Sequence, residues 1–226
     1  MFGLTYDIVP GRPAEKIMLV MLPGAGMCAE DFRARGFVET LRERGLPVDT
    51  VMVDVSTDDY VSATFGKYMN GEVVSALLAG GYQRIWLAGI SLGAYGVMRL
   101  LQEQAGDIEG VLLLSPFLST RGTIARIMGA GGLNGWLPLP EEREGADESL
   151  LCWLKENLVA GKLPVEIYLG WGEADRYADA SRLLAAWLPA NRIFRTHGDH
   201  DWPTWTALWH DMLNALPFER IDCRFQ

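Results

Sequence analysis

The chain contains few of the residues that most often bind metals or form covalent cross-links. Its 226 residues include three cysteines and three histidines. The cysteines, Cys28, Cys152 and Cys223, are widely spaced and odd in number, and they match no metal-binding pattern. We therefore expect reduced thiols in a cytoplasmic protein, with no bound metal.

Long apolar runs and an excess of positive charge are also missing. No apolar run approaches the length of a membrane span, and the N-terminus lacks the basic region and apolar core of a signal peptide. The formal net charge of −9 argues against nucleic acid and anionic membrane surfaces as main partners. The length predicts one domain, residues 1–226, with a sizeable core.

Apolar runs alternate with helical patterns along the chain. This alternation predicts an α/β fold with a mostly parallel central sheet and helices on both faces. The expected strands cover residues 4–9, 16–22, 48–55, 85–90, 111–114, 165–169 and 192–195. The expected helices cover residues 29–44, 67–79, 92–104 and 204–216, and a loop is expected to start at Asp58 or Asp59.

Residues 118–164 interrupt this alternation, because they contain no strand pattern. The acidic run from Glu141 to Glu144 fits a solvated connection. Several apolar residues in the interval are nevertheless expected to pack against another apolar surface of the protein. They are Leu133, Trp136, Leu137 and Leu139. An insertion here would lie at the carboxyl edge of the sheet, where ligands of parallel sheets bind, so we expect a small lid or cap. A homodimer surface would look the same in sequence.

A Gly-x-Ser-x-Gly pentapeptide, Gly89 to Gly93, lies between an apolar run and a helical pattern. A strand that turns this sharply into a helix strains the backbone of the central serine, and only small residues fit two positions either side. The turn holds the Ser91 hydroxyl at the helix N-terminus. There the free Leu92 N–H can stabilise a developing oxyanion. The pattern therefore predicts a nucleophilic serine.

A serine hydroxyl needs a base to take its proton, and a histidine normally serves. His210 lies within the last helical pattern and is expected to be a surface or packing residue, whereas His197 ends the last expected strand. His200 directly precedes Asp201, which can cap the last helix. Since the base must project from a loop over the carboxyl edge of the sheet, we predict His200.

A buried carboxylate has to orient that histidine. Asp175, in the loop after the expected strand 165–169, is the best placed, with Glu173 and Asp179 as reserves. The chain order Ser91, Asp175, His200 is the one expected of a serine triad on this architecture.

The segment after the first buried strand can complete the site. It reads Leu22-Pro-Gly-Ala-Gly26, and its glycines allow backbone N–H groups to approach a ligand, so Ala25 or Gly26 should donate alongside Leu92. The same segment with Asp54 after the next strand is close to a dinucleotide-binding fingerprint. That alternative places Pro23 before the first glycine and leaves the serine pentapeptide unexplained.

Taken together, the chain resembles a small α/β-hydrolase of the serine esterase or thioesterase type. The resemblance spans nearly the whole length, and it rests on Leu22-Pro-Gly-Ala-Gly26, Gly89-Ile-Ser-Leu-Gly93, Gly172-Glu-Ala-Asp175 and Gly198-Asp-His-Asp-Trp202. It implies the α/β-hydrolase fold, with Ser91 as nucleophile, His200 as base and Asp175 as orienting acid. Pro23-Gly24 departs from the His-Gly of many members and is similar to thioesterase-like ones.

We therefore expect an acyl-enzyme on Ser91, formed from a small-molecule acyl ester or thioester, with no metal or organic cofactor. Two other functions stay open at this point. The same triad could transfer the acyl group to an alcohol or amine, or the fold could bind a ligand without catalysis.

Overall fold

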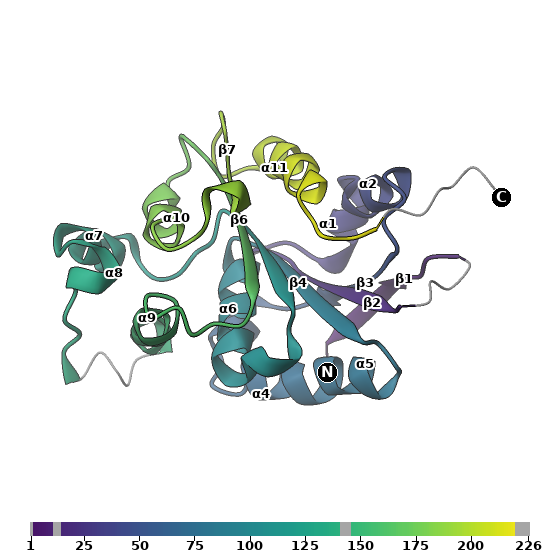
Figure 1. The fold of residues 1–226 in the computed structure, drawn as a ribbon, viewed down its shortest axis with the longest axis horizontal. Coiled ribbons are helices and arrows are strands. Elements are labelled where there is room, and N and C mark those ends of the chain that lie inside the picture. Colours follow the sequence, from purple (N-terminus) through teal and green to yellow (C-terminus); the bar gives the residue numbers. More distant parts are fainter. Residues whose placement is uncertain (1, 11–14, 141–145, 220–226) are drawn as a thin grey trace.

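The computed structural model describes residues 2–10, 15–140 and 146–219. A seven-stranded sheet runs through its centre (Figure 1). The strands are β1 (Gly3–Asp7), β2 (Ile17–Leu22), β3 (Val48–Asp54), β4 (Arg84–Ile90), β5 (Gly110–Leu114), β6 (Glu166–Gly172) and β7 (Ile193–Thr196). All seven predicted strands are therefore present, which confirms the α/β class.

The strands lie in the order β1-β3-β2-β4-β5-β6-β7. Only β1 is antiparallel to its neighbour; the other five pairings are parallel. Every residue of β2 and β5 is buried, as expected for strands covered on both faces. Since β2 leads to β3 on one side and β4 leads to β5 on the other, the strand order reverses between β2 and β4. A crevice opens at such a reversal, beyond the carboxyl ends of the strands.

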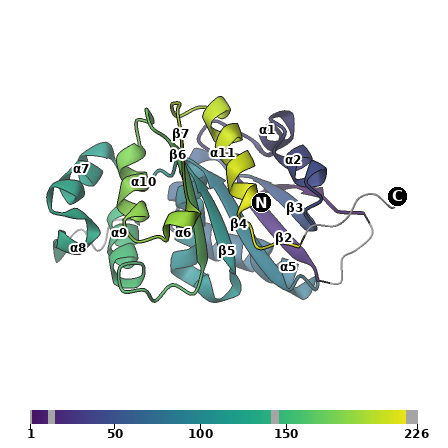
Figure 2. The ribbon, with the colours of Figure 1, turned by 45° about the horizontal axis from the view of Figure 1, so that its top comes forward.

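Helices cover both faces of the sheet (Figures 1 and 2). One face carries α1 (Ala29–Ala34), α2 (Phe37–Glu43) and α11 (Trp202–Asn214). The other carries α3 (Thr57–Val61), α4 (Phe65–Tyr68), the π-helical turn Met69–Val74, α5 (Ser75–Ala79), α6 (Leu92–Gln104), α9 (Ala146–Asn157) and α10 (Ala178–Ala185). Short 3₁₀ turns cover Ala105–Asp107 and Ala190–Arg192. Among the described helices, none is both long enough and apolar enough to cross a membrane.

Two local predictions were wrong. The single helix expected over residues 29–44 is two helices, because Gly36 between them has a left-handed φ of 76°. A right-handed helix cannot continue through that conformation. The loop expected from Asp58 or Asp59 is the short helix α3, which Ser56 caps by accepting a hydrogen bond from the Asp59 N–H.

Residues 118–164 contain α7 (Arg121–Gly129), α8 (Gly132–Gly135) and α9, and no strand among those described. Leu133 and Trp136 are buried in the core on the α6 side of the sheet, whereas Leu137 is 81% exposed and Leu139 is 53% exposed. In both views α7 and α8 lie beyond α9 and α10 (Figures 1 and 2). The acidic run 141–144 falls outside the described residues, as does Cys223.

Candidate active site

Ser91 lies in the sharp turn between β4 and α6, next to the strand-order reversal. Its φ is +54°, a left-handed conformation that a residue with a side chain adopts rarely and at an energetic cost. The turn is fixed on both sides: the Ser91 N–H donates to Leu114 O at 2.9 Å, and the Ser91 carbonyl accepts from the Phe117 N–H at 3.1 Å. The strain predicted for this turn is present in the structure.

Two glycines make this turn possible. A Cβ atom on Gly89 would lie 2.5 Å from the backbone of Gly93 and Ala94. A Cβ atom on Gly93 would overlap the carbonyl oxygens of Leu22 and Pro23 at the end of β2. Strand, helix and neighbouring strand end therefore approach more closely than any side chain allows.

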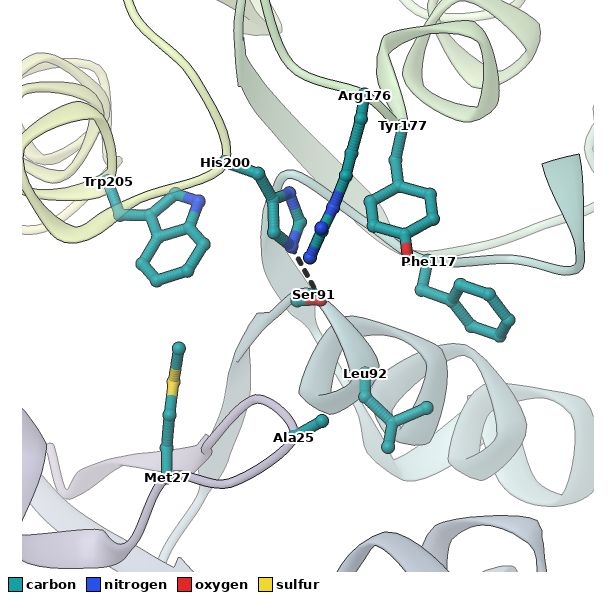
Figure 3. Close-up of a pocket in the computed structure, with 9 residues that line it drawn as sticks. All are labelled: Ala25, Met27, Ser91, Leu92, Phe117, Arg176, Tyr177, His200 and Trp205. Carbon is teal, nitrogen blue, oxygen red and sulfur yellow. Dashed lines mark hydrogen bonds between the residues drawn. The ribbon is translucent and has the colours of Figure 1, made fainter.

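Ser91, His200 and Asp175 form a hydrogen-bonded chain across three loops. The His200 Nε2 atom lies 2.8 Å from Ser91 Oγ (Figure 3). On the other side of the ring, Nδ1 lies 2.9 and 3.0 Å from the two carboxylate oxygens of Asp175. A carboxylate only accepts, so Nδ1 carries the proton and Nε2 of the neutral ring accepts from the Ser91 hydroxyl. The structure brings together the three residues that the sequence singled out.

His200 is held by the start of α11. Asp201 caps this helix by accepting from the Thr204 N–H at 3.1 Å, as its sequence position predicted. Before it, Gly198 has a φ of +137°, and a Cβ atom there would overlap the Thr204 hydroxyl. The His200 N–H donates to the Asp199 carboxylate at 2.7 Å. The turn thus aims the imidazole inward from the end of β7.

Asp175 is 5% exposed, and its carboxylate lies below the surface. Burial by itself raises the pKa of Asp175. Hydrogen bonds from His200 and from the Tyr177 N–H, together with the nearby Ser115 hydroxyl, stabilise the charged form more strongly and hold the pKa below its ordinary value. The hydrogen bond from the Tyr177 N–H to the Asp175 carboxylate is 2.7 Å long. The result is an ionised carboxylate directed at a histidine.

Ser115 is a second strained residue near this carboxylate. It directly follows β5 with a φ of +47°, and its hydroxyl is completely buried. The hydroxyl has no well-aligned hydrogen bond among the described residues, yet it lies near enough to Asp175 to help lower its pKa. Sequence reasoning noticed Ser115 only as the place where no carboxylate follows the strand.

The segment between β2 and α1 faces Ser91 from the other side of the crevice. The Met27 N–H donates to Gly24 O at 3.2 Å, which closes a turn with Ala25 and Gly26 at its centre. Gly26 has a φ of +72°, as the third position of a type II turn requires. Of the two central residues, Ala25 lines the cavity at Ser91. Leu92, the first residue of α6, lines it as well.

A cavity of about 340 Å³ opens at Ser91 (Figure 3). Besides the residues already placed there, its walls are Met27, Phe117, Arg176, Tyr177 and Trp205. Met27 and Trp205 stand on one side of Ser91, and Phe117, Tyr177 and Arg176 on the other. Sequence reasoning did not name these five. Position was the available signal for four of them, since Met27 and Phe117 follow strand ends and Arg176 and Tyr177 follow Asp175, whereas Trp205 lies inside α11.

The other candidates lie elsewhere. The His197 side chain is 99% exposed and pairs with Glu173 at 3.0 Å, and His210 Nδ1 lies 3.1 Å from an Arg44 nitrogen. Asp179 pairs with Arg182 on the surface of α10. Neither reserve carboxylate contacts His200 in this arrangement.

Asp54, the acid of the dinucleotide alternative, accepts a hydrogen bond from the Ala29 N–H at 2.7 Å. The first turn of α1 therefore occupies this carboxylate. Across residues 2–10, 15–140 and 146–219, no group of three or more histidine, cysteine and acidic side chains could hold a metal ion.

No protein-family model and no curated protein matches the chain. Solved structures do match nearly its whole length. A ferulic acid esterase is 14% identical, covers 95% of this chain and 97% of its own, and has a TM-score of 0.67. A substrate-bound, fluorophosphonate-binding serine hydrolase from Staphylococcus aureus is 16% identical, with 94% and 91% covered and a TM-score of 0.66. A monoacylglycerol lipase from Paleococcus ferrophilus is 18% identical, with 94% and 96% covered and a TM-score of 0.61.

These structures are hydrolases, and each covers 94% or 95% of this chain. The chain therefore has the α/β-hydrolase fold, which confirms the resemblance predicted from its four motifs.

Proposed function

We propose that this protein is a serine hydrolase that cleaves a small ester or thioester. One observation carries the proposal: Ser91 Oγ, the His200 ring and the Asp175 carboxylate form a continuous hydrogen-bonded chain that ends at an open cavity. The similar structures named as esterases and a lipase support the same class of reaction.

In the proposed first step, His200 Nε2 takes the Ser91 proton as Oγ attacks the carbonyl carbon of the substrate. The carbonyl π electrons move to its oxygen, which the N–H groups of Leu92 and of Ala25 or Gly26 stabilise. The tetrahedral intermediate then collapses, and the alcohol or thiol leaves with the proton from His200. An acyl group remains on Ser91.

In the second step, water attacks the acyl group and gives its proton to His200. The same backbone N–H groups stabilise the second oxyanion, and collapse returns the proton to Ser91 Oγ and releases a carboxylic acid. Asp175 stays ionised throughout, because its lowered pKa keeps it charged beside the imidazolium that forms in each step.

The cavity walls fit a partly apolar substrate. Met27 and Trp205 form an apolar wall on one side of Ser91, and the Phe117 and Tyr177 rings meet edge to face on the other, with centroids 5.8 Å apart. Aromatic rings bury a large apolar area at little cost in conformational freedom. We infer that the acyl chain and the leaving group occupy these two sides.

A panel of 4-nitrophenyl esters and acyl thioesters tests the proposal. Ser91→Ala and His200→Ala should each reduce kcat by at least about 10³-fold, since either change removes the proton transfer to His200. Ser181→Ala removes another buried hydroxyl, and His197→Ala removes the exposed histidine; both should hydrolyse the panel as the unchanged protein does. Full activity of Ser91→Ala would refute the proposal.

A further inference from the structure

Arg176 is the only arginine or lysine on the wall of the cavity at Ser91, within the residues that the structure describes. It follows Asp175 in the loop after β6 and is exposed. Figure 3 shows its side chain extending beside the His200 ring toward Ser91. Its guanidinium carbon also lies 5.2 Å from the Tyr177 ring centroid, which braces the side chain at this position. None of the proposed proton transfers uses it.

The Arg176 guanidinium has no ion pair or hydrogen bond with the described part of the chain. The acidic residues nearest to it in sequence are each directed elsewhere. Glu173 pairs with His197 at 3.0 Å, Asp175 binds His200 at 2.9 Å, and Asp179 binds Arg182 at 2.7 Å. Other arginines are paired: Arg33 and Arg42 with Asp7, Arg84 with Glu15 and Glu109, and Arg192 with Glu166.

A second arginine continues the same side of the site. A smaller cavity of about 50 Å³ shares Arg176 and Tyr177 with the first, and its far wall includes Arg121 at the start of α7. Arg121 also has no ion pair or hydrogen bond with the described residues. Asp179 lines this cavity too, but Arg182 neutralises its charge. The charged side chains that line this smaller cavity, two arginines and one aspartate, are therefore net positive in a chain whose net charge is −9.

We propose that Arg176 binds a carboxylate on the substrate, so that the protein acts on esters or thioesters that carry an acid group. This inference rests on the proposed hydrolase function and assigns it a substrate class. A guanidinium matches a carboxylate with two parallel N–H···O bonds, and its charge is permanent at neutral pH. A single arginine in a cavity of this size fits a small monoacid. Arg176 is a specificity-determining residue, because the acid group it holds is remote from the reacting carbonyl.

Two matched pairs of substrates test this role. The first is the mono-4-nitrophenyl ester of glutaric acid and its glutaramic counterpart, which places the carboxylate on the acyl side. The second is 4-acetoxybenzoate and 4-acetoxybenzamide, which places it on the leaving group. In each pair the amide has nearly the same shape without the charge. The unchanged protein should prefer the acid, measured as kcat/KM, in at least one pair.

Arg176→Gln should reduce that preference by about tenfold, chiefly through KM, since an exposed charged contact remote from the reacting atoms contributes to binding equally before and during the reaction. Arg176→Lys should retain part of it. Arg182→Gln removes the same charge from the surface of α10 and should leave the preference intact. Equal preference in the unchanged protein and Arg176→Gln, for both pairs, would overturn the inference.

Binding without turnover separates this inference from the proposed function. In Ser91→Ala, calorimetry with the same four compounds should show tighter binding of the acid in the preferred pair, and adding Arg176→Gln should abolish the difference. If no ester is cleaved but this difference is seen, the hydrolase proposal fails and Arg176 is still a carboxylate site. If esters are cleaved and acid and amide bind Ser91→Ala equally, only the role of Arg176 fails.

Discussion

Replacing Gly89 by alanine tests whether the close approach of β4 and α6 places Ser91. The backbone of Gly89 is extended within β4, so alanine can adopt its conformation without strain. The added Cβ atom, however, would lie 2.5 Å from Ala94 N, Gly93 C and Gly93 O. All three are backbone atoms at the start of α6. No side-chain rotation can relieve the overlap, so the helix must move relative to the strand.

The size of the movement follows from normal contact distances. Carbon and backbone oxygen atoms approach to roughly 3.3 Å, so α6 must shift by about 0.8 Å. Overpacking of this kind costs about 1–3 kcal/mol of unfolding free energy. The shift also displaces Leu92 N–H and Ser91 from His200. Since a misplacement near 1 Å can cost about 100-fold in rate, we expect kcat/KM to fall by about 10- to 100-fold.

Gly71→Ala is the matched control. A Cβ atom there would meet nothing within 4 Å, and Gly71 lies in a helical turn without a left-handed φ. Alanine should therefore stabilise the protein by about 0.5–1 kcal/mol and leave turnover unchanged. Urea denaturation followed by tryptophan fluorescence gives the stabilities, and ester hydrolysis gives the rates. Gly89→Ala with the stability and activity of Gly71→Ala would refute the packing argument.

Three further changes probe the site and the core. Asp175→Asn should lower kcat by about 10³- to 10⁴-fold in ester assays, because an amide can donate to Nδ1 and favour the wrong tautomer. The lowered pKa of Asp175 means that its contribution to stability is complete above an unfolded pKa of about 3.9 and is lost as pH falls through the folded pKa. The urea concentration at the unfolding midpoint should therefore fall as the pH is lowered below about 4. The fall should be smaller in Asp175→Asn. Trp209→Ala should cost about 3–5 kcal/mol in urea unfolding, since Trp209 is fully buried and donates to Phe37 O at 3.0 Å.

Each of these has a clear contrary result. Near-normal turnover by Asp175→Asn would mean that His200 needs no orienting carboxylate. An equal acid-induced loss of stability with and without Asp175 would assign that loss to other carboxylates. One of these is Glu109, whose pKa is lowered mainly by its hydrogen bond with Arg84. A loss under about 1 kcal/mol in Trp209→Ala would contradict a tight contact between α11 and α2, where the Trp209 ring stacks on Phe37.

The sequence predicted those features that are encoded locally. Apolar runs predicted β2, β4 and β5, because parallel strands buried on both faces need nearly uninterrupted apolar residues. Gly89 and Gly93 marked the turn at Ser91, since no other residue fits so close to the backbone. Asp201 identified the start of α11 and so the loop that carries His200. Each of these signals can be read from residues that are close together in the chain.

What the sequence left open depends on contacts between distant segments. Residues 29–44 could form one continuous helix or two helices that break at Gly36. The two-helix arrangement buries Phe37 against α11, which favours it. The strained Ser115 lies near Asp175, which is 60 residues away in the chain. The sequence did not predict a role for Arg176, because a charged loop residue is ordinarily solvated. Its position at the cavity is apparent only when β4 and β6 are placed in one sheet.

The most direct test of the central claim is the intact mass of the protein after exposure to a fluorophosphonate probe. The account predicts one adduct on the unchanged protein, none on Ser91→Ala, and an adduct again on Ser181→Ala. His200→Ala should react far more slowly, because its serine has no base. An adduct that persists in Ser91→Ala, or no adduct on a protein that hydrolyses esters, would contradict Ser91 as the nucleophile.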